Sequence, residues 1–137
     1  MDRSLIEIAK SVIQTETDSI LKLKNRIDNN FVKACQLLVS CKGKVVVIGM
    51  GKSGHIGRKI AATLASTGTP AFFVHPGEAG HGDLGMVNAD DVLILISYSG
   101  KSDEITTLLP AINQLNIPIL AMTGNTNQLS QKQLIFI

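Results

Sequence analysis

Apolar residues along this chain fall into short unbroken runs separated by segments of helical period. The runs are rich in Val, Ile, Leu and Phe and lack polar alternation, which is typical of strands covered on both faces. They comprise residues 45–48, 71–74, 92–96 and 117–122, and a fifth run starts at 134. Strands and helices alternate with short connections, which predicts a parallel sheet with helices on both faces. We therefore expect an α/β fold, a three-layer α/β/α sandwich around five parallel strands in the flavodoxin-like order 2-1-3-4-5.

The first expected helix runs from Leu5 to about Asp28 and precedes all the strands. Its Ile residues recur every seventh position, at 6, 13, 20 and 27, and Glu16 interrupts the intermediate apolar position. Such a stripe packs either on the helix's own domain or on a neighbouring subunit, and the pattern leaves both alternatives open.

The later helices are placed by their caps and their apolar stripes. Asn30, Ser53 and Asn127 are the expected N-caps of the second, third and last helices. The expected buried faces are Phe31, Ala34, Cys35 and Leu38 in the second helix, Ile56, Ile60 and Leu64 in the third, and Ile105, Leu108, Leu109, Ile112 and Leu115 in the fourth. Beside the stripe of the third helix, the small residues Gly57, Ala61 and Ala65 are expected to let this helix approach the sheet closely. Gly43 and Gly68 are expected to end the second and third helices. The segment from His75 to Gly85 is expected to be a loop.

Composition narrows the class of protein. A chain of 137 residues points to one domain, residues 1–137. The net charge of +2 is small and its Lys and Arg residues are dispersed, which argues against a nucleic-acid partner. Two cysteines six positions apart form neither a disulfide framework nor a metal motif, so a reducing compartment is expected. No apolar run approaches 18 residues, which argues against a membrane span.

The stretch KVVVIGMGKSGHIGR, residues 44–58, reads as a buried strand, a glycine turn and the start of a helix. Free N–H groups and the positive dipole end at such a helix start suit a phosphate, and Lys52 adds a cation. The turn satisfies GxGxxG, but the dinucleotide fingerprint also requires an acid after the next strand, where this chain has His75 and Pro76. A nucleotide P-loop is excluded because Val46 stands where its first glycine is required. A structural glycine turn and a phosphate or phosphosugar site remain open, and in the second case Gly51 and Ser53 contact the ligand.

A second polar turn, SYSGKS, follows the third strand at residues 97–102. Ser97, Ser99 and Ser102 offer hydroxyls, and Lys101 adds a further cation. The carboxyl ends of parallel strands share one edge of the sheet, so we expect the two turns to converge there. Asp103 is expected only to complement the helix dipole, whereas Glu104, beside an anion site, is expected to have a chemical role.

These segments carry a resemblance to a known family. The run VVVIGMGKSGHIGRKIAATLASTGTPAFFVHPGEAGHGDLGMV, followed by ISYSGKSDEI, resembles the SIS (sugar isomerase) domain of bacterial arabinose-5-phosphate isomerases. The resemblance implies interconversion of D-arabinose 5-phosphate and D-ribulose 5-phosphate through an enediol, on the route to the 3-deoxy-D-manno-octulosonate (Kdo) of lipopolysaccharide. It also implies a cytoplasmic homotetramer that has no membrane partner.

The same resemblance implies roles for particular residues. Lys52 and Glu104 match positions implicated in catalysis, Lys52 in stabilising phosphate or enediolate and Glu104 in proton transfer. Matches to substrate-contacting positions are Gly68, Thr69, His75, His81 and part of the segment 107–116. His75 also matches a position that binds inhibitory zinc, and no cofactor is required. The histidines have simpler alternatives: His75 and His81 as residues that order their loop, and His55 as a helix-surface residue.

Two departures from the family pattern bear on activity. Tyr98 and Lys101 stand in the second turn where the family has a sequence of the type SNSGES. The family also continues beyond the final LIFI with another catalytic glutamate, a catalytic histidine and two CBS domains, so the resemblance implies a C-terminally incomplete SIS domain without the CBS pair. The alternative to an isomerase is a non-catalytic phosphosugar-binding module, either a sensor or an assembly fragment.

Overall fold

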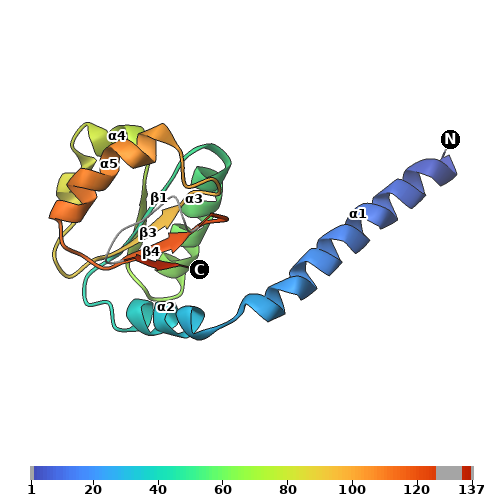
Figure 1. Ribbon diagram of the computed structural model, residues 1–137, viewed down its shortest axis with the longest axis horizontal. Helices are drawn as coiled ribbons and strands as arrows, with labels where there is room; N and C mark the ends of the chain where they lie inside the picture. Colours follow the sequence, from blue (N-terminus) through green and yellow to red (C-terminus); the bar gives the residue numbers. More distant parts are fainter. Residues whose placement is uncertain (1, 126–133, 137) are drawn as a thin grey trace.

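The computed structural model describes residues 2–125 and 134–136, and its centre is a five-stranded parallel sheet (Figure 1). The strands are β1 (Val45–Gly49), β2 (Ala71–Val74), β3 (Val92–Ile96), β4 (Ile119–Met122) and β5 (Leu134–Phe136). Their order is β2-β1-β3-β4-β5, so the predicted fold class and strand order are confirmed. The short helix expected after Asn127 lies outside the described residues.

Helices cover both faces of the sheet. α2 (Asn29–Val39) and α3 (Gly51–Ser66) share one apolar core with the sheet, and α4 (Pro76–Gly80), the 3-10 helix η2 (Asp83–Met86) and α5 (Asp103–Gln114) pack on the other face. α4 and η2 occupy the segment expected to be a loop, which corrects that prediction: Pro76 starts the helix and the His75 side chain caps it.

β1 lies in the middle of these layers. Val45, Val46, Val47 and Ile48 are 0% exposed, and the strand pairs with both β2 and β3. Val45 and Val47 face the core under α2 and α3, whereas Val46 and Ile48 face the core under α5. Burial on both faces explains why this strand shows no polar alternation.

α3 meets the sheet through its smallest residues, which confirms the expected close approach at Gly57 and Ala61, although Ala65 is exposed. Gly54, Gly57 and Ala61 are buried, whereas Ile56 is 58% exposed and Ile60 and Leu64 are only partly buried. A Cβ at Gly54 would lie 2.7 Å from the Gly49 carbonyl oxygen, so the helix start and the strand end touch through their backbones. Ile60 and Leu64 pack at the edge of this contact, and only Ile56 of the expected stripe faces outward.

The start of α3 also corrects a predicted cap. The N-cap is Met50, which makes no side-chain capping bond, and Ser53 lies inside the first turn. The helix ends with Thr67 as C-cap, followed by Gly68 at a φ of +99°, the backbone conformation expected of that glycine.

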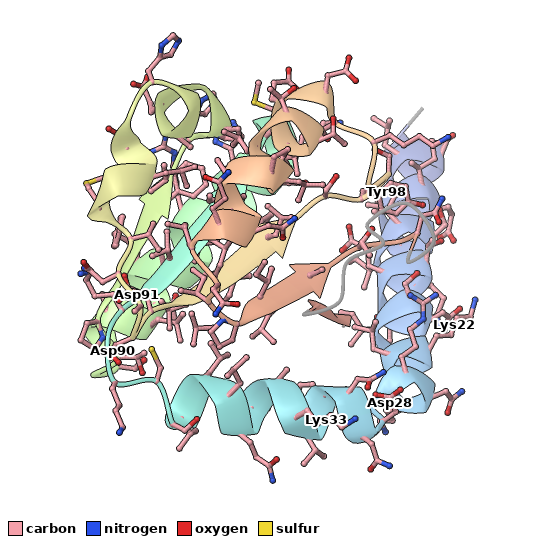
Figure 2. All side chains as sticks on the ribbon, turned by 60° about the vertical axis from the view of Figure 1, so that its left-hand side comes forward. Lys22, Asp28, Lys33, Asp90, Asp91 and Tyr98 are labelled. Carbon is pink, nitrogen blue, oxygen red and sulfur yellow. The ribbon has the colours of Figure 1, made fainter. Side chains whose placement is uncertain are left out.

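The N-terminal helices meet at Asp28, which Figure 2 labels at their junction. α1 (Asp2–Leu23) is followed by the 3-10 helix η1 (Lys24–Arg26). The Asp28 carboxylate accepts hydrogen bonds from the N–H groups of Asn30 and Phe31, so Asp28 rather than Asn30 caps α2.

In α2, Ala34 is buried and Leu38 packs in the core, but Phe31 and Cys35 are exposed, contrary to expectation. α2 ends at Val39, before the predicted stop at Gly43.

α1 extends away from the rest of the fold (Figure 1). Residues 4–23 are exposed throughout, so the helix does not pack on its own domain, and that alternative is wrong. None of the helices in the described part of the chain combines the length and apolar character needed to cross a membrane.

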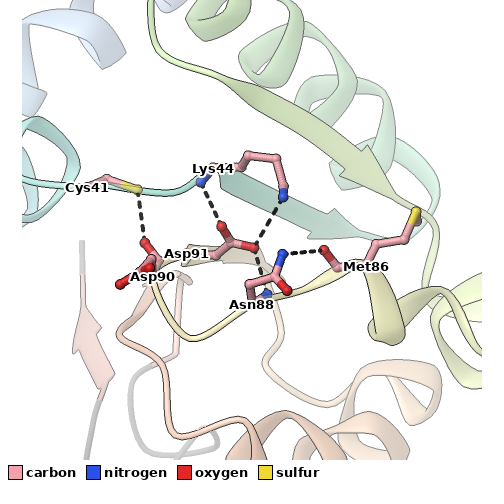
Figure 3. Close-up of polar contacts among 6 residues, drawn as sticks. All are labelled: Cys41, Lys44, Met86, Asn88, Asp90 and Asp91. Atoms are coloured by element: carbon pink, nitrogen blue, oxygen red, sulfur yellow. Dashed lines mark hydrogen bonds and ion pairs between the residues drawn. The ribbon is translucent and has the colours of Figure 1, made fainter.

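A buried carboxylate joins the amino ends of β1 and β3 (Figure 3). Asp91 is 1% exposed and accepts hydrogen bonds from the N–H of Lys44 (2.7 Å) and the N–H of Asn88 (2.8 Å). The Lys44 ammonium lies 3.9 Å from the same carboxylate. Next to it, the Asp90 carbonyl oxygen accepts from the Gly43 N–H and the Cys41 thiol. The network fixes how the chain enters the central strand.

Asp91→Ala should lower the free energy of unfolding by about 2–3 kcal/mol, because the N–H groups of Lys44 and Asn88 lose a buried, charged acceptor. Urea denaturation followed by circular dichroism measures the change. Asp90→Ala is the matched control: the exposed Asp90 contributes its backbone carbonyl, which alanine retains, so its effect should stay within about 0.5 kcal/mol. Equal losses in both variants would contradict this role for the Asp91 side chain.

Candidate functional site

The two predicted turns start at the same level of the sheet. Gly49, the last residue of β1, is the register partner of Ile96, the last residue of β3. One turn therefore leads into α3 and the other into α5 from neighbouring points on the carboxyl edge. The predicted convergence of the two turns is confirmed, and this edge is where open parallel sheets bind ligands.

A pocket of about 340 Å³ lies against the first turns of α3. Its lining residues come from the starts of the turns and from the exit of β4: Lys52, Ser53, Ile56, Ile96, Tyr98, Met122, Thr123 and Gly124. Lys52 is exposed and makes no ion pair with a described residue. The pocket thus combines one ammonium group and hydroxyls with a largely apolar wall.

The serine turn is ordered by its own side chains. Ser97, 2% exposed, accepts a hydrogen bond from the Gly100 N–H (3.2 Å), and its hydroxyl lies 3.3 Å from that of Ser102. The Ser99 hydroxyl accepts from the Lys101 N–H (3.2 Å). Ser102 is the N-cap of α5 but makes no capping bond with its side chain, so the N–H groups of Asp103 and Glu104 lack that partner. Such a turn can hold an anion.

Lys52 and Glu104 reach this edge from opposite faces of the sheet. Lys52 is in the first turn of α3 and Glu104 in the first turn of α5, and both are exposed. Glu104 does not line the Lys52 pocket. A ligand that touches both must therefore extend across the ends of β1 and β3.

A second hollow, of about 240 Å³, lies on the other flank of the α3 start. Gly51, Gly54, His55, Arg58, Phe73 and His75 line it. The Arg58 guanidinium stacks over the Phe73 ring at 4.4 Å, which holds a cation here. His55 is exposed on the helix surface, as its simpler alternative predicted.

His75 has a definite hydrogen-bonding state. Its Nδ1 accepts from the Gly77 N–H at 3.2 Å, so a neutral ring carries its proton on Nε2. Zinc needs a free ring lone pair, and the described residues form no cluster of three or more His, Cys, Asp or Glu side chains suited to a metal. This arrangement does not fit a zinc site, and zinc inhibition at His75 stays a prediction.

Other predicted substrate contacts are dispersed. His81 is exposed at the end of α4, on the α5 side of the sheet. Gly68 and Thr69 follow the far end of α3, whose 16 residues span about 24 Å from the Lys52 turn. Within the segment 107–116, Leu108 and Ile112 are buried in the core, which leaves only its outer residues accessible. One chain therefore does not gather all these positions into one site.

The exit of β4 also contributes to the site, which was not among the residues expected from the sequence. Met122, Thr123 and Gly124 line the Lys52 pocket because β4 is the next strand after β3 in the sheet. The predicted strand order contained this information, since the exit of β4 must share the same edge. Arg58 and its stacking on Phe73 had no comparable signal in the sequence.

Relatives of known activity match most of this chain. An arabinose 5-phosphate isomerase KdsD from Pseudomonas aeruginosa is 59% identical over 120 residues, 88% of this chain and 37% of the relative. The Escherichia coli K12 protein of the same name is 58% identical over 118 residues, 86% of this chain and 36% of the relative. The chain therefore spans little more than a third of the length of these relatives.

A solved structure gives the same result for the fold. E. coli CFT073 c3406, in complex with arabinose 5-phosphate, superposes with a TM-score of 0.90 at 42% identity, covering 99% of this chain and 74% of that one. The family described as SIS domain matches residues 37–136, which include all five strands and both polar turns. This chain belongs to the SIS domain family.

Proposed function

We propose that this chain is the sugar-phosphate-binding part of an arabinose-5-phosphate isomerase. The observation that carries the proposal is the pair of polar turns at one level of the carboxyl edge, with the exposed Lys52 beside a pocket. The serine turn takes the phosphate, and Lys52 faces the reacting end of the sugar. Relatives named as arabinose 5-phosphate isomerases and a related structure holding arabinose 5-phosphate support this choice of substrate.

The proposed reaction needs only proton transfers. A base removes the proton from C2 of the aldose phosphate, the carbonyl oxygen at C1 gains a proton, and an enediol forms. The hydroxyl proton at O2 then leaves and C1 receives a proton, which gives the ketose. Glu104 is the proposed proton carrier, and Lys52 stabilises the negative oxygen that develops. The redox change is internal to the sugar, so the proposal includes no required metal or cofactor.

A second function, a non-catalytic phosphosugar-binding module, is favoured by one observation. Lys52 and Glu104 occupy opposite faces of the sheet and do not share a pocket. Incubating this chain, and the chain joined to the remaining part of the P. aeruginosa relative, with D-ribulose 5-phosphate separates the two functions. Appearance of D-arabinose 5-phosphate supports the isomerase, whereas binding without turnover in both proteins supports the module.

The proposal extends to assembly and location. We place the protein in the cytoplasm, on the Kdo route to lipopolysaccharide, as a homotetramer. The support for self-assembly is α1, where large apolar residues are at least half exposed: Leu5, Ile6, Ile8, Val12, Ile13, Ile20, Leu21 and Leu23. An isolated helix gains little stability in water, and a seven-residue repeat of Ile packs well against a second copy of itself. A second copy could also bring Gly68 and Thr69 to the site.

Lys52→Ala should reduce kcat/KM at least about tenfold, because a charged donor to the substrate is lost. The measurement is steady-state isomerisation of D-ribulose 5-phosphate by the joined protein. Lys59→Ala, which removes an exposed lysine of the same helix outside the pocket, is the control and should keep the original rate. An unchanged rate in Lys52→Ala would remove Lys52 from the mechanism.

Glu104→Gln should lower kcat by about 10²- to 10⁴-fold, the range for losing a proton carrier, while affinity for the sugar phosphate persists. Titration calorimetry reports the affinity and the same isomerisation assay reports kcat. Asp103→Asn, the neighbouring acid in the same exposed first turn, should be active. Loss of affinity with normal turnover at saturation would assign Glu104 to binding instead.

Replacing both Ile13 and Ile20 by Lys should reduce the assembly to smaller species, because two charges enter the proposed apolar seam of α1. Light scattering coupled to size exclusion measures the mass. Ser11→Lys adds a charge outside the Ile repeat and should leave a mass of four chains. If the double variant has the same mass as the unmodified protein, α1 does not hold the assembly together.

A further inference from the structure

Tyr98 is a large, solvent-exposed aromatic side chain at the candidate site. It is 85% exposed, comes from the serine turn, and lines the pocket that contains Lys52. Figure 2 labels it at the carboxyl edge, far from Asp90 and Asp91 at the other end of the strands. No described residue forms a hydrogen bond with its hydroxyl group.

The position of Tyr98 is nevertheless fixed, by the segment that follows β4. Its carbonyl oxygen accepts hydrogen bonds from the Gly124 N–H (3.0 Å) and the Thr123 hydroxyl (3.4 Å). A Cβ at Gly124 would lie 2.9 Å from Cε2 of the tyrosine ring, so the ring lies directly against this glycine. Any larger residue at 124 would displace the ring. The ring is therefore a preformed part of the pocket wall.

The wall suits the carbon skeleton of a sugar. Together with Tyr98, the side chains of Ile56, Ile96 and Met122 give the pocket an apolar lining, to which Lys52 adds an ammonium group. One face of a sugar presents C–H groups, which pack on aromatic and aliphatic carbon, while its oxygens need polar partners. Pockets that join apolar walls to a few placed polar groups are typical of small-molecule sites. The serine turn, from which Tyr98 projects, offers groups for the phosphate.

We propose that Tyr98 determines specificity by packing on the C–H face of the bound sugar phosphate, between the phosphate at the serine turn and the oxygens at Lys52. This inference rests on the proposed function, because it requires a sugar phosphate in this pocket. The ring recognises the sugar carbons and not the phosphate. It therefore favours a sugar phosphate over inorganic phosphate, which the polar groups alone do not do.

The chain contains a single tyrosine and no tryptophan, so its intrinsic fluorescence reports on Tyr98 alone. Acrylamide is a neutral quencher, and its access to the ring is independent of the charges at Lys52 and the phosphate. D-arabinose 5-phosphate should protect Tyr98 from quenching, whereas inorganic phosphate should not. Protection by phosphate alone would overturn the proposal, because the ring would then sense only a change in the turn.

Calorimetry on variants gives the second measurement. Tyr98→Asn should weaken binding of D-arabinose 5-phosphate by about three- to tenfold, the worth of a typical aromatic contact, with binding of inorganic phosphate unchanged. Tyr98→Phe keeps the ring and should restore the affinity. Val39→Asn is the matched surface control, since Val39 is 88% exposed on α2, away from the pocket.

The outcomes separate this inference from the proposed function. If the unmodified chain fails to bind D-arabinose 5-phosphate, both are overturned. If it binds but Tyr98 stays fully accessible to acrylamide, only the role of Tyr98 is overturned. Equal weakening of sugar phosphate and phosphate in Tyr98→Asn would likewise assign Tyr98 to shaping the turn. If Tyr98→Asn fails to fold, acrylamide quenching of the unmodified chain remains the test of the role of Tyr98.

Discussion

The backbone contact between the end of β1 and the first turn of α3 is the constraint on which the site depends. Gly54 leaves no space for a side chain against the Gly49 carbonyl, so the helix starts directly on the strand. Gly57 and Ala61 continue this close approach along the helix. As a result the first turn of α3 is held at the carboxyl edge, and Lys52 and Ser53 project beside the exits of β3 and β4. A larger residue at 54 would move every group on that turn.

The site combines parts with different roles. The exit of β1 supplies the ammonium group, the exit of β3 supplies an ordered turn of serines, and the exit of β4 supplies the support for the wall. Hydrogen bonds within the serine turn and between Tyr98 and Gly124 order these parts before any ligand binds. Preorganisation of this kind lowers the entropy lost on binding. The amino edge, in contrast, has a structural role, because Asp91 there fixes the entry of β1 and β3.

Much of this architecture could be predicted from the sequence, for physical reasons. Strands buried on both faces leave unbroken apolar runs, and the two turns at the ends of β1 and β3 must then share an edge. The small residues at 57 and 61 indicated the close approach of α3 to the sheet, but the apolar period placed Ile56 in the core, because it does not show that the face with Gly54 and Gly57 is the one that meets the sheet. It assigned the cap of α2 to Asn30 rather than Asp28, since both residue types cap well. The separation of Gly68 and Thr69 from Lys52 follows from the length of α3, which the predicted helix end at Gly68 already contained.

The unpacked α1 has a consequence for how the chain folds. The sheet and its covering helices bury their apolar surface within one molecule, so their stability is independent of protein concentration. α1 finds no such surface among the described residues of its own chain, so under the proposed self-assembly its order would depend on an encounter between chains. In such an assembly the sheet would be stabilised within one molecule, whereas the stability of α1 would follow mass action and depend on protein concentration. Dilution would then melt α1 first and leave the sheet intact, so concentration would set how much of the chain is folded.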